Sequence, residues 1–492
     1  MIVTRNGSTE NLSIGTQALR GASWFALFKF ISQVFSWTIT VIIAHILEPS
    51  DYGLLVIGMF ITGYAAMFSE LGLGPAVIQK PDVTQDEISS VFWLSVVIGI
   101  LLAVSCLPIA SLTARIFHES RVISVTRSAA FLFLFSALSI VPSALLRREL
   151  KFKLLGIIEM ISTATSCIGM LAIATMGGGV WTLMGGLLIQ GFTQMVLLYR
   201  LVNWLPRLHF RYSEVQSYLK VGVAVCGMRS LFYLWDQSDK FFAGRAWNTS
   251  MLGFYSFALQ LAQLPTEKIV TLINQVSFPA LSRLQNDKAG FTGFYLNTTK
   301  ITATLVLPLF VGGYLVGGEV VKLLLNEKWF PMITVFEYLC LAQIMTSLNA
   351  INNFVHVARG KPYWSLYYHI GGVIVMPVSF FLAAPFGIHA MLIPWFTSFM
   401  GMSMTWIIIT LYGIGISPAL YLKGLLHPVI GTLCMATGVL LCSNIRPFVP
   451  VVGFSSLLIV VVKMSVGTLL YAGYLWFFDR DVFLGLRKLR KS

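Results

Sequence analysis

Residues 22–46 read ASWFALFKFISQVFSWTITVIIAHI, a long apolar stretch that decides the class of protein. It exceeds the roughly 20 apolar residues with which one helix crosses a bilayer. Four polar residues inside it recur at spacings of four, three and four: Lys29, Gln33, Ser36 and Thr40. A helix has about 3.6 residues per turn, so these side chains lie on one face. The stretch therefore predicts a membrane helix with one polar side.

The rest of the chain has the same character, because 57% of its 492 residues are hydrophobic and only 11% are charged. Its mean hydropathy is +0.79. A soluble domain carries about 25% charged residues, so a soluble globular protein is excluded. We expect an all-α integral membrane protein with about fourteen membrane-spanning helices. Their approximate limits are 22–46, 53–78, 89–113, 123–146, 154–176, 180–203, 218–240, 251–281, 295–318, 332–357, 364–384, 387–412, 420–443 and 451–478.

The chain carries 34 Lys and Arg against 20 Asp and Glu, a formal net charge of +14. Cytoplasmic loops of membrane proteins collect Lys and Arg. With a cytoplasmic N-terminus, about 21 cations fall in cytoplasmic segments and about 8 in outer ones, which favours cytoplasmic N- and C-termini. The excess charge thus indicates orientation, and it gives no reason to expect nucleic acid as a partner. Five cations remain inside apolar segments: Lys29, Arg229, Lys268, Lys300 and Lys463.

Two links between expected spans share the pattern Ser-x-x-Gly 200 residues apart, at Ser50 and at Ser250. The same offset pairs Lys29 with Arg229. A repeat of this kind suits a transporter of two lobes, in which the substrate site lies at the repeat interface. We expect an N-terminal lobe of six helices at residues 1–210, a second lobe at 211–415, two more helices at 416–480 and a basic cytoplasmic tail at 481–492.

Five short motifs in the links carry a resemblance to a known family. They are EPSDYGL (48–54), ELGLGPAVIQ (70–79), LRRELKF (146–152), FPALSRLQ (278–285) and NEKW (326–329). Together they resemble the Wzx-type polysaccharide flippases of the multidrug/oligosaccharidyl-lipid/polysaccharide (MOP) superfamily, and in particular the branch that includes colanic acid exporters. The resemblance covers roughly residues 15–430, and the last two helices match only in hydrophobicity.

The resemblance implies two pseudo-symmetric bundles of six helices in a V around a central cavity. It also implies alternating access and, as substrate, an oligosaccharide linked to undecaprenyl pyrophosphate in the bacterial cytoplasmic (inner) membrane. Membrane lipids, a coupling ion such as H⁺ or Na⁺ and a polysaccharide polymerase or export complex are the further partners that such a protein would have.

Four of the cations inside spans are the candidates for binding the pyrophosphate in a cationic cavity: Lys29, Arg229, Lys268 and Lys300. Arg offers a planar fork and Lys a compact charge, and both suit phosphate oxygens. The alternative is that a Lys near a helix end extends its ammonium to the membrane interface. Lys463 has no assignment from the sequence.

Three acids at or inside spans are candidates for ion coupling or gating: Glu70, Asp236 and Glu267. Burial raises the pKa of an unpaired carboxyl, so such a group can carry a proton. The alternative is a structural role as the partner of a buried cation. Glu70 precedes a Gly-rich turn and equally suits a role in holding that turn.

Amide side chains are the candidates for contacts with sugar hydroxyls, because an amide both donates and accepts hydrogen bonds. They are Gln33 in the first helix and Asn349, Asn352 and Asn353 in the tenth. Hydrogen bonds between helices are the common alternative use of Asn in membranes.

Catalytic and metal chemistry has no support in the sequence. The six cysteines form no CxxC or Cys/His cluster, and no GxxxxGK[ST] phosphate loop occurs. We therefore expect a secondary transporter without cofactors rather than an enzyme. The alternatives are a lipid-precursor flippase or a MATE-like cation-coupled exporter. A membrane polysaccharide polymerase fits less well, because no paired catalytic carboxylates are present.

Overall fold

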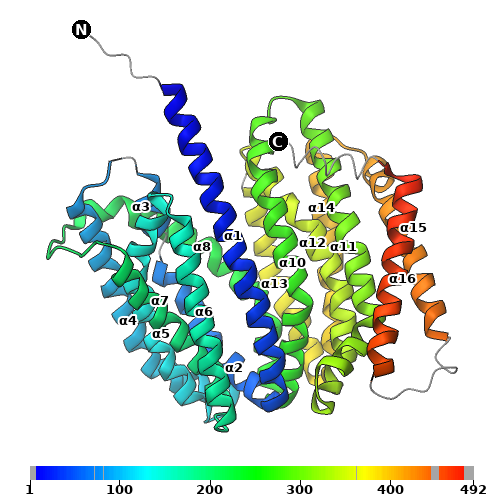
Figure 1. The fold of residues 1–492 in the computed structure, drawn as a ribbon, viewed down its shortest axis with the longest axis horizontal. Helices are drawn as coiled ribbons and strands as arrows, with labels where there is room; N and C mark the ends of the chain where they lie inside the picture. The colour runs from blue at the N-terminus through cyan, green and yellow to red at the C-terminus, as the bar shows by residue number, and fades with distance from the viewer. Residues whose placement is uncertain (1–6, 71–72, 81, 362, 445–453, 481–492) are drawn as a thin grey trace. The chain divides into compact units, whose positions relative to one another are not determined.

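The computed structural model describes residues 7–480 apart from 71–72, 81, 362 and 445–453. Within this described part the chain is helical and contains no strand (Figure 1). The helices are α1 (Gly7–Ile46), α2 (Pro49–Glu70), α3 (Leu73–Gln79), α4 (Gln85–Phe117), α5 (Val122–Arg148), α6 (Phe152–Thr175), α7 (Val180–Leu201), α8 (Tyr212–Asp236), α9 (Ser238–Ala246), α10 (Thr249–Arg283), α11 (Lys288–Leu324), α12 (Ile333–Ala358), α13 (Tyr363–Ala383), α14 (Met400–Ile414), α15 (Pro418–Asn444) and α16 (Phe454–Phe478). Short helical turns occur at η1 (Glu327–Met332), η2 (Ala384–Phe386), η3 (Ala390–Leu392) and η4 (Trp395–Phe399).

Twelve helical segments of the described chain are long and apolar enough to cross a membrane. This confirms the all-α membrane class. The two long helices that do not reach this hydropathy are α8 and α10, which carry charged and polar residues along their length. The expected number of about fourteen spans stays a prediction for that reason.

Polar side chains at the links determine where several helices begin. At the start of α4 the Thr84 hydroxyl accepts from the Glu87 amide, and the Glu87 carboxylate accepts from the Thr84 amide in return. Asn248 caps α10 by accepting from the Met251 amide. These caps satisfy amides that would otherwise lack a partner in the first helical turn.

The repeat with an offset of 200 residues is visible in the helix boundaries. Helix α2 begins at Pro49 and α10 at Thr249, while α1 ends at Ile46 and α9 at Ala246. The two halves differ in the helix that precedes these starting points. Helix α1 is continuous, whereas the corresponding helix of the second half is broken at Gln237 into α8 and α9. The sequence predicted one helix at 218–240, so this break is a correction.

The chain divides into two compact units, with the boundary between Gln237 and Ser238. In the first unit, the main helix pairs are α4 with α5, α1 with α6 and α6 with α7. Helix α8 packs there against α2, α3 and α4. The Tyr233 hydroxyl donates to the Phe60 carbonyl at 2.6 Å, and Cys226 approaches the Met67 carbonyl at 3.2 Å. By its contacts, α8 belongs to the first unit. The lobe boundary expected at residue 210 was drawn from the sequence repeat instead, and it stays a prediction.

In the second unit, α12 packs against α10 and α11, and the hairpin of α15 and α16 packs against α11. Its core includes Tyr295, Val355 and Leu411, which are fully or almost fully buried. The last two helices therefore join this unit, whereas the expected tail at 481–492 lies outside the described residues.

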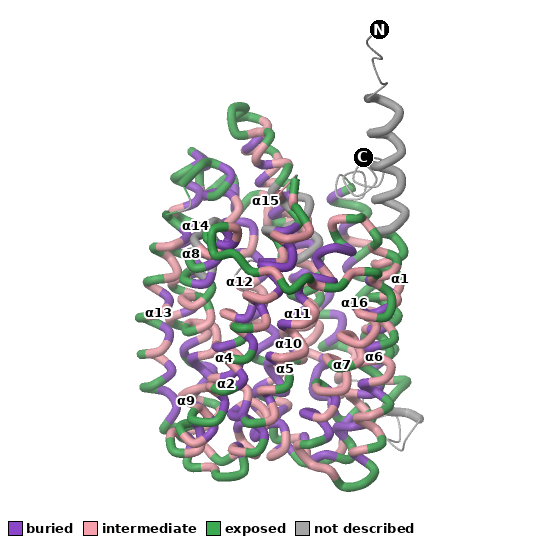
Figure 2. Tube along the Cα trace, turned by 90° about the vertical axis from the view of Figure 1, so that its left-hand side faces the viewer, coloured by how far each residue is buried: buried purple, intermediate pink, exposed green. Residues whose placement is uncertain are grey.

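Many large apolar side chains point away from both cores, for example Phe30, Leu101 and Leu469. Figure 2 shows exposed residues along the full length of the helices and not only at their ends. Exposure of this kind is costly in water but not in lipid, whose tails are as apolar as these side chains. The distribution agrees with helices that face a membrane.

Candidate functional site

The polar face of α1 lies beside the contact of this helix with α6. That contact is close, because a Cβ at Gly156 of α6 would lie 3.0 Å from the Phe28 ring and 3.2 Å from the Phe25 Cα. Lys29 is exposed, with its ammonium 5.7 Å from the centroid of the Phe25 ring. Gln33 is half-buried one turn further on. The polar side of α1 stays a prediction, in which Lys29 is the exposed charge.

Lys29 lies in the apolar part of α1, which forms a candidate membrane span over Ser23–Ile46 among the described side chains. Binding of the pyrophosphate and extension of the ammonium to the membrane interface both stay predictions for Lys29.

Arg229 is the corresponding cation of the second half and is also exposed. It lies three residues after Cys226 and four before Tyr233, the two residues that contact α2. Spacings of three and four residues put it on the same side of the helix, at the edge of this contact. Asp236, at the end of α8, is half-buried and accepts from the Gln237 side chain at 2.6 Å.

Lys300 is half of an ion pair. Its ammonium lies 2.6 Å from the Asp479 carboxylate at the end of α16, and the Asp479 side chain is only 4% exposed. This ion pair gives Lys300 a structural role that differs from the alternative drawn from the sequence, which was extension to the membrane interface. A role of Lys300 in the pyrophosphate cavity requires release from Asp479.

Lys463, which the sequence left unassigned, forms the matching pair. Its ammonium lies 2.6 Å from the Glu319 carboxylate of α11, and its side chain is 2% exposed. Helix α11 thus contributes Lys300 and then Glu319, and the antiparallel α16 contributes Lys463 and then Asp479. We name these two contacts the crossed ion pairs. The sequence analysis missed both acids, because nothing local links them to their partners.

Lys268 and Glu267 lie on an exposed side of α10. The residue before them, Thr266, is buried and its hydroxyl lies 3.2 Å from both Gln343 and Ser347 of α12. Contact with α12 therefore directs the two charged neighbours outward. Lys29 and Arg229 belong to the first unit and Lys268 and Lys300 to the second, so one cavity built from all four stays a prediction.

The amide row of α12 lies largely between helices. Asn352 is fully buried, accepts from the Tyr295 hydroxyl at 2.9 Å and donates to Asn349 at 3.1 Å. The interhelical alternative therefore explains Asn352. The buried Asn349 Nδ2 and Asn353 Oδ1 have no hydrogen-bond partner among the described residues and retain their polar capacity.

A buried carboxylate at the start of α9 was outside the predicted set. Asp239 is 0% exposed and accepts from the Tyr255 hydroxyl at 2.8 Å, and the Trp395 indole donates to the same hydroxyl at 3.0 Å. The sequence analysis singled out Asp236 instead, three residues before it. The predicted Glu70 ends α2, and its side chain lies outside the described residues.

A family model described as "Polysaccharide biosynthesis protein" matches residues 42–334. The teichuronic acid biosynthesis protein TuaB of Bacillus subtilis (strain 168) is 24% identical over 384 residues, which cover 76% of this chain and 78% of TuaB. The lipopolysaccharide biosynthesis protein WzxC of Escherichia coli (strain K12) is 22% identical over 344 residues, which cover 68% of this chain and 69% of WzxC.

A solved structure of the lipid II flippase MurJ in an inward closed conformation is similar over 93% of this chain and 99% of its own, with a TM-score of 0.72. The two sequences are 15% identical. At this identity the likeness shows a shared fold, and the function must be argued from the family and from the residues.

Proposed function

Because the chain belongs to the polysaccharide biosynthesis protein family, we propose that it is a flippase that moves oligosaccharide repeat units linked to undecaprenyl pyrophosphate across the bacterial inner membrane. The family match over residues 42–334 carries this proposal. The names of its relatives support it, since TuaB and WzxC are named for teichuronic acid and lipopolysaccharide biosynthesis, and MurJ is named as a flippase of lipid II.

In this proposal the exposed cations inside the spans bind the pyrophosphate. Lys29 and Arg229 are both exposed, as that role requires, and Lys29 lies in a candidate membrane span. A pyrophosphate inside the membrane needs opposite charge, because an unpaired anion there loses its hydration. The two residues are equivalent in the repeat, so each half of the protein supplies one phosphate ligand. Lys268 and Lys300 are secondary candidates, and Gln33 and Asn353 are candidate contacts for sugar hydroxyls.

Transport proceeds by alternating access of a cavity between the two lobes. The substrate enters from the cytoplasmic side of the membrane. The excess of Lys and Arg in the loops favours a cytoplasmic location of both termini. Asp236 and Glu267 are the candidate acids for H⁺ or Na⁺ coupling, with Glu70 as a third. Complexes with a polymerase or export machinery would receive the product at the outer face.

A deletion strain tests the function. Loss of the protein should cause undecaprenyl-pyrophosphate repeat units to accumulate on the cytoplasmic face. A polymerase defect would instead leave single repeat units on the outer face, and that result would overturn the proposal. Proteoliposome transport unchanged after collapse of both proton and sodium gradients would remove ion coupling while leaving the flippase proposal intact.

Substitutions test the phosphate ligands in the same strain. Lys29→Gln and Arg229→Gln should each lower transport at least about tenfold at normal protein level, because a charge-assisted contact contributes about 1.5–3 kcal/mol. Lys423→Gln is the matched control, since Lys423 is an exposed cation of α15 outside the proposed cavity. Full complementation by both variants would exclude the proposed pyrophosphate ligands.

A further inference from the structure

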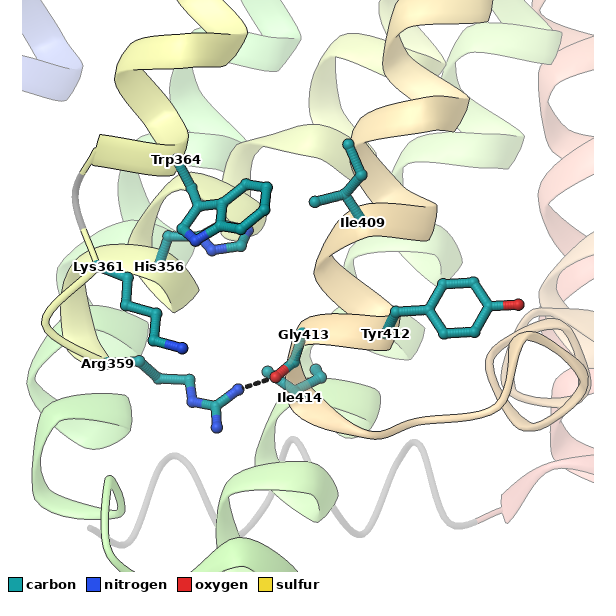
Figure 3. Close-up of a pocket in the computed structure, with 8 residues that line it drawn as sticks. All are labelled: His356, Arg359, Lys361, Trp364, Ile409, Tyr412, Gly413 and Ile414. Carbon is teal, nitrogen blue, oxygen red and sulfur yellow. Dashed lines mark hydrogen bonds between the residues drawn. The ribbon is translucent and has the colours of Figure 1, made fainter.

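A pocket of about 300 Å³ lies in the second unit where α12 ends and α13 begins, and it also touches the end of α14 (Figure 3). Its lining includes Arg359, Lys361, His356, Trp364 and Tyr412. The lining thus carries two cations and no carboxylate. Figure 3 shows the Arg359 and Lys361 side chains both extending from the link toward α14. We propose that this pocket binds the phosphate headgroup of an anionic membrane phospholipid, in addition to the transport activity proposed above.

The backbone at the end of α12 builds the cationic side of the pocket. Gly360 adopts φ 68°, a conformation that glycine takes without strain, and the Lys361 amide donates back to the His356 carbonyl at 2.9 Å. This turn places Arg359 and Lys361 on either side of Gly360, facing one pocket. One guanidinium N–H of Arg359 donates to the Gly413 carbonyl at the end of α14. A guanidinium has five donors, so the others remain for a phosphate.

Lys361 is the cation that is available to a ligand. Among the described residues its ammonium forms no ion pair or hydrogen bond. A third cation lies near the end of α14, because a Cβ at Gly415 would lie 3.4 Å from the Lys288 Nζ. Lys288 does not line the pocket, so the cationic lining consists of Arg359 and Lys361.

An aromatic groove continues from the pocket along α13 and α14. This second cavity, of about 310 Å³, shares Trp364 and Ile409 with the first and is lined further by Tyr367, Tyr368 and Trp406. The Tyr368 and Trp406 rings stack with centroids 4.8 Å apart. Trp and Tyr at span ends lie at the level of the lipid headgroups. A phosphate in the first cavity would therefore have its glycerol and acyl chains in the second.

Cavity size favours a phospholipid over the proposed transport substrate. Both cavities are at the lower end of the range for small-ligand sites, which is roughly 300–1,000 Å³. An oligosaccharide on a pyrophosphate needs more room than one phosphodiester headgroup. The site also rests on residues other than Lys29 and Arg229, so it can be tested separately from transport.

The test uses the full chain in nanodiscs of phosphatidylcholine with a minor fraction of phosphatidylglycerol, with retained lipid counted by native mass spectrometry. The wild type should retain phosphatidylglycerol in preference to phosphatidylcholine. Lys361→Gln should lower this retention about tenfold, the loss expected from one charge-assisted contact. Lys423→Gln, an exposed cation outside the pocket, should retain the lipid as the wild type does.

A second variant tests the groove without changing any charge. Gly371 lines the groove, and a Cβ there would meet nothing within 4 Å, so Gly371→Leu fits the fold and fills the cavity. It should also lower retention of phosphatidylglycerol. Wild-type retention in either Lys361→Gln or Gly371→Leu would overturn the proposal. Displacement of the bound lipid by an equal amount of undecaprenyl pyrophosphate would overturn it as well, because the site would then belong to the polyprenyl carrier.

Discussion

Single charged residues inside the helices fall into two groups. Lys29 and Arg229 are exposed in the first unit, whereas Lys300 and Lys463 are bound to carboxylates of a facing helix. A buried charge without a partner is strongly unfavourable, so the second group stabilises the fold only as pairs. The exposed group is accessible to a ligand and is therefore the better candidate for substrate binding.

Removal of one partner of a crossed ion pair should destabilise the protein. Lys300→Met leaves Asp479 buried without its cation, and we expect a loss of about 3 kcal/mol in the free energy of unfolding. The double variant Lys300→Met/Asp479→Leu should recover most of this loss. Thermal unfolding of the detergent-purified protein measures both effects.

The matched control is the ion pair between Lys151 and Glu149, which has the same 2.6 Å separation but side chains that are 58% and 52% exposed. Lys151→Met should cost less than about 1 kcal/mol, because exposed pairs contribute little. Equal losses at Lys300 and Lys151 would contradict the structural role assigned to the crossed ion pairs.

A carboxylate in the first turn of α8, Glu214, makes the stability of the protein fall at acid pH. The Ser90 hydroxyl donates to Glu214 at 2.6 Å and lowers its pKa below the ordinary value, and His209 and Arg211 act in the same direction, while burial opposes them. A lowered pKa in the folded state stabilises the protein at pH above the unfolded value of 4.5, and this contribution is lost as pH falls through the folded value.

Glu214→Gln should therefore flatten the decline in melting temperature between about pH 5 and pH 3. Glu149→Gln changes an exposed glutamate that does not contact Ser90, and it should keep the wild-type decline. A decline of the same steepness in Glu214→Gln and in the wild type would show that another group causes this fall in stability.

The ion-pair partners and the buried amides could not be predicted from the sequence. Lys300 and Asp479 are 179 residues apart, and no local spacing connects them. The polar face of α1 could be predicted because Lys29 and Gln33 lie within one helix, where the period alone fixes the face. For Asn352 the spacing gave the correct face, but only the position of Tyr295 on another helix decides what this face contacts.

Between elements, the contact of α1 with α6 depends on a small residue at the crossing. Gly156→Leu should destabilise the first unit by about 1–3 kcal/mol, because a larger side chain overlaps Phe25 and Phe28. Gly424→Leu in α15 is the control, since a Cβ there would meet nothing within 4 Å. Similar melting temperatures for the two variants would show that α1 packs elsewhere.

Hydropathy located the helices but not their interruptions. The sequence predicted one span at 218–240, whereas the structure has α8 and α9 with a break at Gln237. Residues 236–240 around the break are all polar, whereas residues 231–235 before it are apolar or aromatic. This polar run was a signal that the span prediction did not use. The short α3 was missed as well, because its seven residues are fewer than a span needs.

At the scale of the whole molecule, the family resemblance drawn from five short motifs is confirmed by the match over residues 42–334. The fold class is confirmed by the similarity to the MurJ structure. Motifs in links identify a family because they determine turns and helix starts. They carry no information on the substrate, which depends on side chains in a cavity, so the sugar could not be predicted.

The expected orientation can be measured directly. In a cysteine-free background, Met176→Cys should react in intact cells with a maleimide that does not cross the membrane, because the link after α6 is expected outside. Ser417→Cys, in the link between α14 and α15, should react only after the membrane is opened. Both residues are exposed, so access does not limit the reaction. The reverse pattern would overturn the cytoplasmic assignment of the termini.

The crossed ion pairs also affect the order in which the protein can be made. Helix α16 follows α11 in the chain and carries Lys463 inside its span, where a lysine costs about 2.5–3.5 kcal/mol to insert alone. Its partner Glu319 was synthesised 144 residues earlier. Stable insertion of α16 therefore depends on a correctly placed α11. In a newly made chain with a misplaced α11, Lys463 would lie in the membrane without its carboxylate, and membrane proteases would degrade that chain.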